Sequence, residues 1–253
     1  MGVGMWMSPD DTEYPVLGGL TRQVIAEPFL LGKAAGRARQ RGNFPDRYWN
    51  ADFRALLTAA EFARTDWQDI DIGWPPDEAE TRHEIEYLLG LIGNRTSDCI
   101  REVVAQNAGF LGYFLDLMMM TPASHPETFH VMKIACRVSE MTMAYFKDKF
   151  NRARPSQLCP DLIPPVAVSG HPSYPSGHSL TAHLIAYCLA EVCPEKADAL
   201  RILADRIGVN REIAGFHYPS DTKAGRMIAE RAHVFLHECP KFRVSVGLAQ
   251  GEW

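Results

Sequence analysis

From about residue 51 onward, apolar residues recur three and four positions apart, the spacing that gathers side chains on one face of an α-helix. In 51–64, for example, one stripe contains Phe53, Leu56, Leu57, Ala60 and Phe62. Alternation of β-branched residues, which would indicate strands, is scarce throughout. The pattern therefore predicts an all-α fold, a single-domain bundle of about eight helices, whose clearest segments are 51–64, 80–93, 97–120, 126–150, 176–192, 194–213 and 220–238.

The first 50 residues follow a different pattern. They contain Gly, Pro and Arg without clear periodicity, including the basic stretch GKAAGRARQRG at 32–42. Chain ends of this kind are often poorly ordered, so we expect 1–50 to form a loosely ordered N-terminal arm. No internal repeat or low-complexity linker divides the rest of the chain. We therefore predict one all-α catalytic domain over 51–253.

Composition and charge narrow the classes of function. Of the 253 residues, 46% are hydrophobic and 23% are charged, as in ordinary globular proteins. The formal net charge of −5 gives no general attraction to nucleic acid or to an anionic membrane surface, so neither is expected as a partner. Any anion that the protein binds must therefore meet a local cluster of cations.

Three further features bear on location. No segment is long and apolar enough for a membrane span, which takes about 20 residues. The first residues lack the basic and apolar regions of a secretory signal. The six cysteines contain no CxxC pair, which favours buried free thiols. We therefore expect a soluble, cytoplasmic protein.

Three short segments combine residue types that suit an anion. Taken singly, each is a weak signal: Lys and Arg near a helix end usually form a solvated surface, PSGH often only starts a helix, and a His near an Asp is commonly structural. Their order, spacing and combination are much more specific. The segments are Lys147-x6-Arg154-Pro155, Pro175-Ser176-Gly177-His178 and Arg211-x5-His217-x3-Asp221.

This motif set resembles that of the phosphatidic-acid-phosphatase type 2 (PAP2) superfamily, which has KxxxxxxRP, PSGH and SRxxxxxHxxxD. Residues 127–236 are similar to the soluble bacterial class A non-specific acid phosphatases of that superfamily. The resemblance implies a PAP2/haloperoxidase-like helical fold, metal-independent hydrolysis of small-molecule phosphate monoesters through a phosphohistidine, phosphotransfer as a side activity, and a homo-oligomer. Two features of this chain depart from the family pattern. Asn210 stands where the pattern has Ser, although its amide can still donate a hydrogen bond. The likened enzymes are periplasmic, whereas no secretory signal is visible here.

The cations of the motifs suit a phosphoryl group, which carries about two negative charges at neutral pH. Arg154 and Arg211 offer planar guanidinium forks, and Lys147 offers a mobile point charge. The Ser176 hydroxyl and the backbone N–H of Gly177 stand at a helix start and complete an anion cradle. Three cations can replace a magnesium ion, and no carboxylate cluster with metal-ligand spacing accompanies them. We therefore expect no metal and no cofactor.

Two histidines allow two catalytic roles. The Asp221 carboxylate can accept a hydrogen bond from one ring nitrogen of His217, which leaves the other nitrogen to attack phosphorus. Because Pro219 interrupts the helix, His217 is expected on a turn and Asp221 in the first turn of the next helix. His178 then serves as general acid to the leaving group and as general base to water. The two histidines hold these roles in the family that the chain resembles.

The remaining histidines are less informative. His171 and Tyr174 precede the PSGH segment and are candidates, with Asn210, for lining the substrate pocket, although loop packing explains the first two equally well. His233 and His237 are four residues apart on one helical face. Without a third ligand nearby, a structural or surface role is expected for this pair.

A vanadium-dependent haloperoxidase, with vanadate as its cofactor in the phosphate position, is the main alternative. Some members of that group have Asn before the second Arg, as in Asn210–Arg211. Those enzymes are typically much longer than this chain, and the spacing from Lys147 to Arg154 favours a phosphatase. A non-catalytic phosphate-binding module would not require both histidines and Asp221. A membrane phosphatase of lipid phosphates is disfavoured by the missing transmembrane segments.

Overall fold

The computed structural model describes residues 49–253, in which helices are joined by turns and loops and no strand occurs. The all-α prediction is confirmed, with nine helices of eight or more residues in this part of the chain. Asn50–Trp253 form one compact unit. The expected arm over 1–50, with its basic stretch, falls almost wholly outside the described residues. The helices are α3 (Ala51–Phe62), α4 (Glu78–Gly90), α5 (Ser97–Ala108), α6 (Leu111–Met118), α7 (Pro126–Phe150), α8 (Pro155–Leu158), α9 (Gly177–Val192), α10 (Ala197–Ile213), α11 (Pro219–Leu236) and α12 (Pro240–Gln250).

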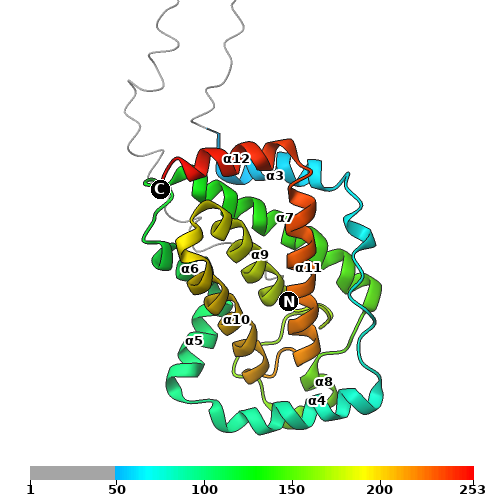
Figure 1. Cartoon of the computed structure of the whole chain (residues 1–253). Helices are drawn as coiled ribbons and strands as arrows, with labels where there is room; N and C mark the ends of the chain where they lie inside the picture. The colour runs from blue at the N-terminus through cyan, green and yellow to red at the C-terminus, as the bar shows by residue number, and fades with distance from the viewer. Residues whose placement is uncertain (1–48) are drawn as a thin grey trace, which may run out of the picture. The chain divides into compact units, whose positions relative to one another are not determined.

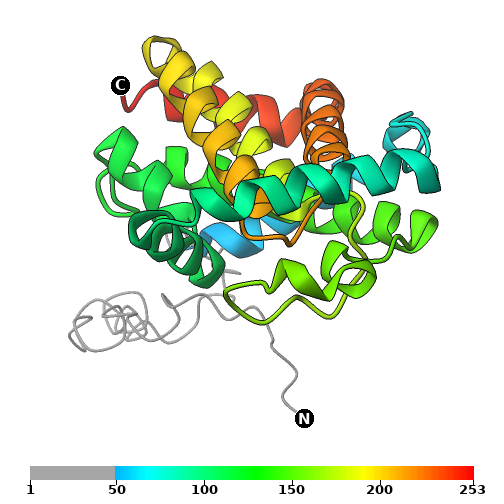
Figure 2. The same cartoon turned by 90° about the horizontal axis from the view of Figure 1, so that it is seen from below.

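Helix α9 lies at the centre of the bundle, with α7, α10 and α11 packed around it (Figure 1). Its sequence is apolar on nearly every face, and twelve of its sixteen residues are buried. A helix that is hydrophobic all round is stable only where other helices cover it, which explains its central place. Figure 2, the view from below, shows α4 running across one end of the bundle.

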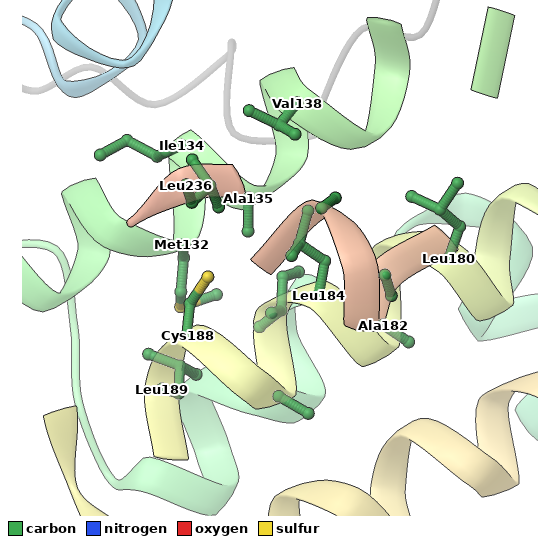
Figure 3. Close-up of a cluster of buried hydrophobic side chains, with 14 of the residues drawn as sticks. Met132, Ile134, Ala135, Val138, Leu180, Ala182, Leu184, Cys188, Leu189 and Leu236 are labelled. Carbon is green, nitrogen blue, oxygen red and sulfur yellow. The ribbon is translucent and has the colours of Figure 1, made fainter. Parts of the chain in front are cut away.

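Aliphatic side chains from α7, α9 and α11 fill the space between these helices (Figure 3). Burying one such side chain contributes about 1.5–3 kcal/mol to stability, so this cluster holds the three helices in fixed relation. This packing therefore also fixes the positions of the polar residues at the ends of α7, α9 and α11. The labelled members, all fully buried, are Met132, Ile134, Ala135, Val138, Leu180, Ala182, Leu184, Cys188, Leu189 and Leu236.

Helix starts follow local signals in the sequence. Ser176 is the N-cap of α9, and its hydroxyl oxygen accepts a hydrogen bond from the Ser179 backbone N–H at 3.4 Å. The first turns of α7, α11 and α12 contain Pro126, Pro219 and Pro240. Proline is tolerated there because its missing N–H would have had no intrahelical partner.

Two helix boundaries differ from the predictions. The expected helix over 97–120 is divided into α5 and α6 at Gly109, where an extended backbone (φ 165°) ends α5. Helix α12 was not predicted, although it carries a regular apolar face. Its buried residues are Phe242, Ser245, Val246 and Ala249, which follow the three- and four-residue spacing of a helix.

The stripe predicted on α3 is wrong at four of its five positions. Phe53, Leu56, Leu57 and Ala60 are exposed, and Phe62 is buried as predicted, together with Ala55 and Thr58. Charged residues of α3 form ion pairs with side chains of α7, and these pairs turn the small-residue face of α3 toward the core.

No helix of residues 49–253 is long and apolar enough to cross a membrane. The six cysteines have free thiols, as expected, but only Cys188, Cys193 and Cys239 are buried, whereas Cys99, Cys136 and Cys159 are half-buried.

At Gly225, the backbone of α11 comes very close to the backbone of α9. A Cβ at this position would lie 2.6 Å from the Ser176 carbonyl oxygen and 2.9 Å from the Leu180 backbone nitrogen. Both atoms belong to the start of α9, so they cannot move without shifting the helix that Ser176 caps.

We therefore expect Gly225→Ala to destabilise the protein by about 1–3 kcal/mol, the usual cost of overpacking. Gly247→Ala is the matched control, because a Cβ there meets nothing within 4 Å. It should stabilise α12 by about 0.5–1 kcal/mol, since Ala is the better helix former. Urea unfolding of both variants measures the difference, and equal effects would contradict the close approach.

Candidate active site

The three motif segments meet at one end of the bundle, where four helices supply polar residues. As predicted from Pro219, His217 lies on the turn between α10 and α11, and Asp221 lies in the first turn of α11. The other positions are Lys147 in the last turn of α7, Arg154 just before α8, Ser176 at the cap of α9 and Arg211 in the last turn of α10. Each of these side chains is buried.

The hydrogen bonds of His217 define its tautomer. Its Nδ1 lies 3.1 Å from Asp221 Oδ2, and its Nε2 lies 3.0 Å from Arg154 Nη1. A guanidinium can only donate and an ionised carboxylate can only accept, so the proton is on Nδ1 and the lone pair is on Nε2. Burial, together with the charges of Arg154, Lys147 and Arg211, lowers the pKa of His217 well below its usual value. The ring is therefore neutral, with a nucleophilic Nε2.

Asp221 is fully buried and accepts hydrogen bonds from four donors. Besides His217, these are Ser173 Oγ at 2.5 Å, Arg152 Nη1 at 2.8 Å and the Tyr218 backbone N–H at 3.0 Å. Burial raises the pKa of Asp221, and the Arg152 charge and these hydrogen bonds oppose that rise. With all four donors in place, the carboxylate has one orientation toward His217.

Arg154 is held by backbone oxygens around the site. Its Nη1 also donates to the Phe216 carbonyl oxygen at 2.9 Å, and its Nε donates to the His171 carbonyl oxygen at 3.0 Å. Burial lowers the pKa of Arg154 to about 10, so the guanidinium stays charged at neutral pH. Its direction toward His217 Nε2 is therefore fixed before any substrate arrives.

Arg211 retains hydrogen-bonding capacity. Its Nη2 donates to Asn107 Oδ1 at 2.9 Å, and its guanidinium stacks 4.3 Å from the centre of the Phe216 ring. Its buried Nε has no hydrogen-bond partner among the described residues. Burial, and then the charge of Arg154, lower the pKa of Arg211 to about 9. A buried unpartnered donor is costly, and an anion oxygen would satisfy it.

Lys147 differs from the mobile point charge expected. Its Nζ donates to the carbonyl oxygens of Pro172, Ser173 and Pro175 at 2.6, 3.0 and 2.6 Å, which uses all three N–H bonds. Burial, and then the charge of Arg154, lower the pKa of Lys147 to about 7. Lys147 therefore adds positive potential to the site and holds the loop that leads into α9.

His178 lies in the first turn of α9, against α5. Its Nε2 is 3.3 Å from the Gln106 carbonyl oxygen, and its ring centre is 5.2 Å from that of Phe110. A carbonyl oxygen only accepts, so the neutral ring carries its proton on Nε2 and takes up a second proton on Nδ1. Burial, and then the charge of Arg211, lower the pKa of His178 well below its usual value.

The start of α9 adds backbone donors to this set. The first turn of a helix has unpaired N–H groups and a partial positive charge, which favour an anion. A Cβ on Gly177 would overlap Met143 Sδ of α7, so a larger residue here would require the Met143 side chain to move.

The three residues expected around a pocket behave differently from one another. Tyr174 donates its hydroxyl to the Ile72 carbonyl oxygen at 2.9 Å, a loop-packing contact. Asn210 Nδ2 donates to Gln106 Oε1 at 3.1 Å, so its amide supports the residue that contacts His178. His171 Nδ1 accepts from Arg154 Nη2 at 3.0 Å, and His171 also lines an adjacent cavity of about 510 Å³.

Residues 132–245 match the family model of the PAP2 superfamily, and this stretch contains all three motif segments. This segment, a little under half of the chain, is therefore similar to the PAP2 superfamily. The acid phosphatases that the sequence resembles are also among its curated relatives.

A non-specific acid phosphatase of Providencia stuartii is 35% identical over 86 residues, which cover 34% of this chain and 35% of that protein. A non-specific acid phosphatase of Salmonella typhimurium is 30% identical over 140 residues, 53% of this chain and 55% of that protein. The chain thus spans between about a third and half of the length of these relatives. A transmembrane PAP2-type phosphatidylglycerolphosphate phosphatase from Bacillus subtilis aligns with a TM-score of 0.49 at 17% identity, covering 74% of this chain and 92% of that one.

The PAP2 motifs did not identify three residues that support the site. Arg152 contacts Asp221 and also donates from Nη2 to Glu84 Oε2 of α4 at 2.8 Å. Glu84 Oε1 in turn accepts from the Ser220 backbone N–H at 2.7 Å. Ser173 donates to Asp221. The only sequence signal was the position of Arg152 two residues before Arg154, and nothing in the sequence linked Glu84 to this site.

Arg152 should therefore be essential for stability. Its removal leaves the buried carboxylate of Asp221 and the half-buried carboxylate of Glu84 without their cation, and breaking a buried pair typically costs about 3–5 kcal/mol. We expect that loss for Arg152→Gln. Arg82→Gln, on the same helix as Glu84, breaks only an exposed pair with Glu78 and should cost less than about 0.5 kcal/mol. Equal denaturant midpoints for the two variants would contradict the role of Arg152.

Proposed function

We propose that this protein hydrolyses small-molecule phosphate monoesters without a metal ion, through a phosphohistidine on His217. The observation that carries the proposal is the fixed tautomer of His217, whose Nε2 lone pair faces Arg154 inside a buried cluster of cations. Its PAP2 relatives are acid phosphatases, which supports the same chemistry.

In the first step, His217 Nε2 forms a bond to phosphorus while the ester P–O bond breaks. The leaving oxygen takes a proton from His178 Nδ1. Arg154, Arg211 and the N–H groups at the start of α9 hold the three equatorial oxygens, where negative charge is spread in the transition state. Lys147 adds its positive potential.

In the second step, His178, now neutral, accepts a proton from water, and the water oxygen attacks phosphorus as the P–N bond breaks. Phosphate leaves, and both histidines return to their starting states. His178 is neutral in the free site because burial and Arg211 lower its pKa. A bound phosphate dianion raises that pKa again, so substrate binding supplies the charge that His178 needs to act as an acid.

The direct test is hydrolysis of 4-nitrophenyl phosphate by the full chain in excess EDTA. We expect activity to persist, vanadate to inhibit competitively, and His217→Ala to reduce turnover to background. His178→Ala should lose about 10²–10⁴-fold on an alkyl phosphate and much less on the nitrophenyl ester, whose leaving group needs no proton. Activity that disappears in EDTA and returns with a divalent ion would refute the metal-free mechanism. Bromide oxidation with vanadate and peroxide, without phosphatase activity, would establish the haloperoxidase alternative.

The pKa shifts predict a mildly acidic optimum. Attack on phosphorus needs neutral His217, whose pKa lies well below the usual 6.5. The acidic limb of the pH profile of kcat/KM should therefore lie below pH 6.5. Lys147 is charged below its pKa of about 7, so its potential is lost as the pH rises through 7. We expect kcat/KM to decline above about pH 7, measured on two esters of different acidity to separate the titration of the substrate.

The variant Lys147→Gln tests whether Lys147 causes the decline in kcat/KM above pH 7. Burial also raises the pKa of Glu212 to about 7, so two groups titrate in this range. Lys147→Gln should lower kcat/KM by about 10²–10³-fold, as for the loss of one charge-stabilising group, and should make the decline above pH 7 shallower; the part that remains follows the loss of the His178 proton. Lys149→Gln, an exposed position on the same helix, is the control and should leave the profile unchanged. A decline of unchanged steepness in Lys147→Gln would exclude Lys147 as its source.

A further inference from the structure

A second polar cluster lies at the opposite end of the helices that carry the active site. It consists of Glu191 near the end of α9, His233 in the last turns of α11 and His237 at the C-cap of α11. Along α9, Glu191 is thirteen residues from His178, which is about 20 Å at the rise of an α-helix. Within residues 49–253, these three form the one group of His, Cys, Asp and Glu side chains close enough together to hold a metal ion.

The structure supplies the third ligand that the spacing of His233 and His237 lacked in the sequence. Glu191 Oε2 lies 3.2 Å from Nε2 of each imidazole, and the three atoms lie within 4.8 Å of one another. Two ligands of a tetrahedral zinc ion, each about 2.0–2.1 Å from the metal, are about 3.3 Å apart. The N···O separations therefore match the edges of such a site.

The surrounding packing orients both rings. Phe242 of α12 is fully buried and meets the rings of His233 and His237 edge-on, with centroid distances of 6.2 and 5.5 Å. The backbone oxygen of Glu191 accepts from Gln250 Nε2 at 3.0 Å. The ligand side chains keep 23–43% of their exposure, so an ion could enter and water could complete its coordination.

We propose that Glu191, His233 and His237 bind one divalent transition-metal ion, of which zinc fits best. Two imidazoles and one carboxylate suit zinc, whereas calcium and magnesium prefer oxygen ligands alone. On binding, each Nε2 gives its lone pair to the metal and the ring keeps its proton on Nδ1. The ion links the ends of α9 and α11 and takes no part in phosphoryl transfer.

The test is zinc titration of the EDTA-treated, desalted full chain, in competition with a chromophoric chelator. We expect one zinc ion per chain and a higher Tm with zinc. Glu191→Gln and His237→Ala should each weaken binding at least about tenfold, since even ligand-supporting residues contribute that much. Circular dichroism of the zinc-free variants checks that they fold. If His237→Ala does not fold, Glu191→Gln, which preserves side-chain size, still tests the proposal.

Two controls locate the ion. His83→Ala removes an exposed histidine whose ion-pair partner within residues 49–253 is Glu86, and it should leave zinc affinity unchanged. His178→Ala should also leave it unchanged, whereas zinc at the phosphatase site would be lost in that variant. His237→Ala should keep its turnover in EDTA. Affinity equal to wild type in both Glu191→Gln and His237→Ala would overturn the proposal and leave Glu191 as a simple hydrogen-bond acceptor, whatever the outcome of the phosphatase assays.

Discussion

The buried carboxylate of Asp221 is the constraint on which the rest of the candidate active site depends. An ionised carboxylate away from water is costly unless donors surround it, and here four donors come from three separate segments. Its ion pair with Arg152 extends through Glu84 to α4. The same contacts that make burial of Asp221 tolerable therefore orient His217 and tie α4 and the loop before α9 to the start of α11.

The site also concentrates positive charge. Lys147, Arg154 and Arg211 are all buried, and burial lowers the pKa of each. Mutual repulsion adds to this cost, and backbone carbonyl oxygens offset it by accepting from Lys147 and Arg154. Donors fixed in this way need little reorganisation when negative charge develops on a phosphoryl group, which is the electrostatic condition for catalysis without a metal.

Helices α9 and α11 carry the candidate active site at one end and a second polar cluster at the other end. Their starts hold Ser176, His178 and Asp221, and their ends hold Glu191, His233 and His237. The two helices come into close contact where Gly225 meets the first turn of α9, and apolar side chains pack between them farther along. A change at one end can therefore alter stability while the geometry of the other end is preserved by the packed core between them.

The sequence by itself determined the helical class, most helix positions and the main site residues, because helical periodicity, proline and motif spacing are local properties. It also placed His217 on a turn and Asp221 in the next helix. Tertiary structure alone decided the burial of α3, the carbonyl ligands of Lys147 and the link from Arg152 to Glu84. These depend on segments that are tens of residues apart, and no periodicity encodes which of them meet. Glu191 is the plainest case: it is 42 residues from His233 in the chain and reaches it only because α9 packs along α11.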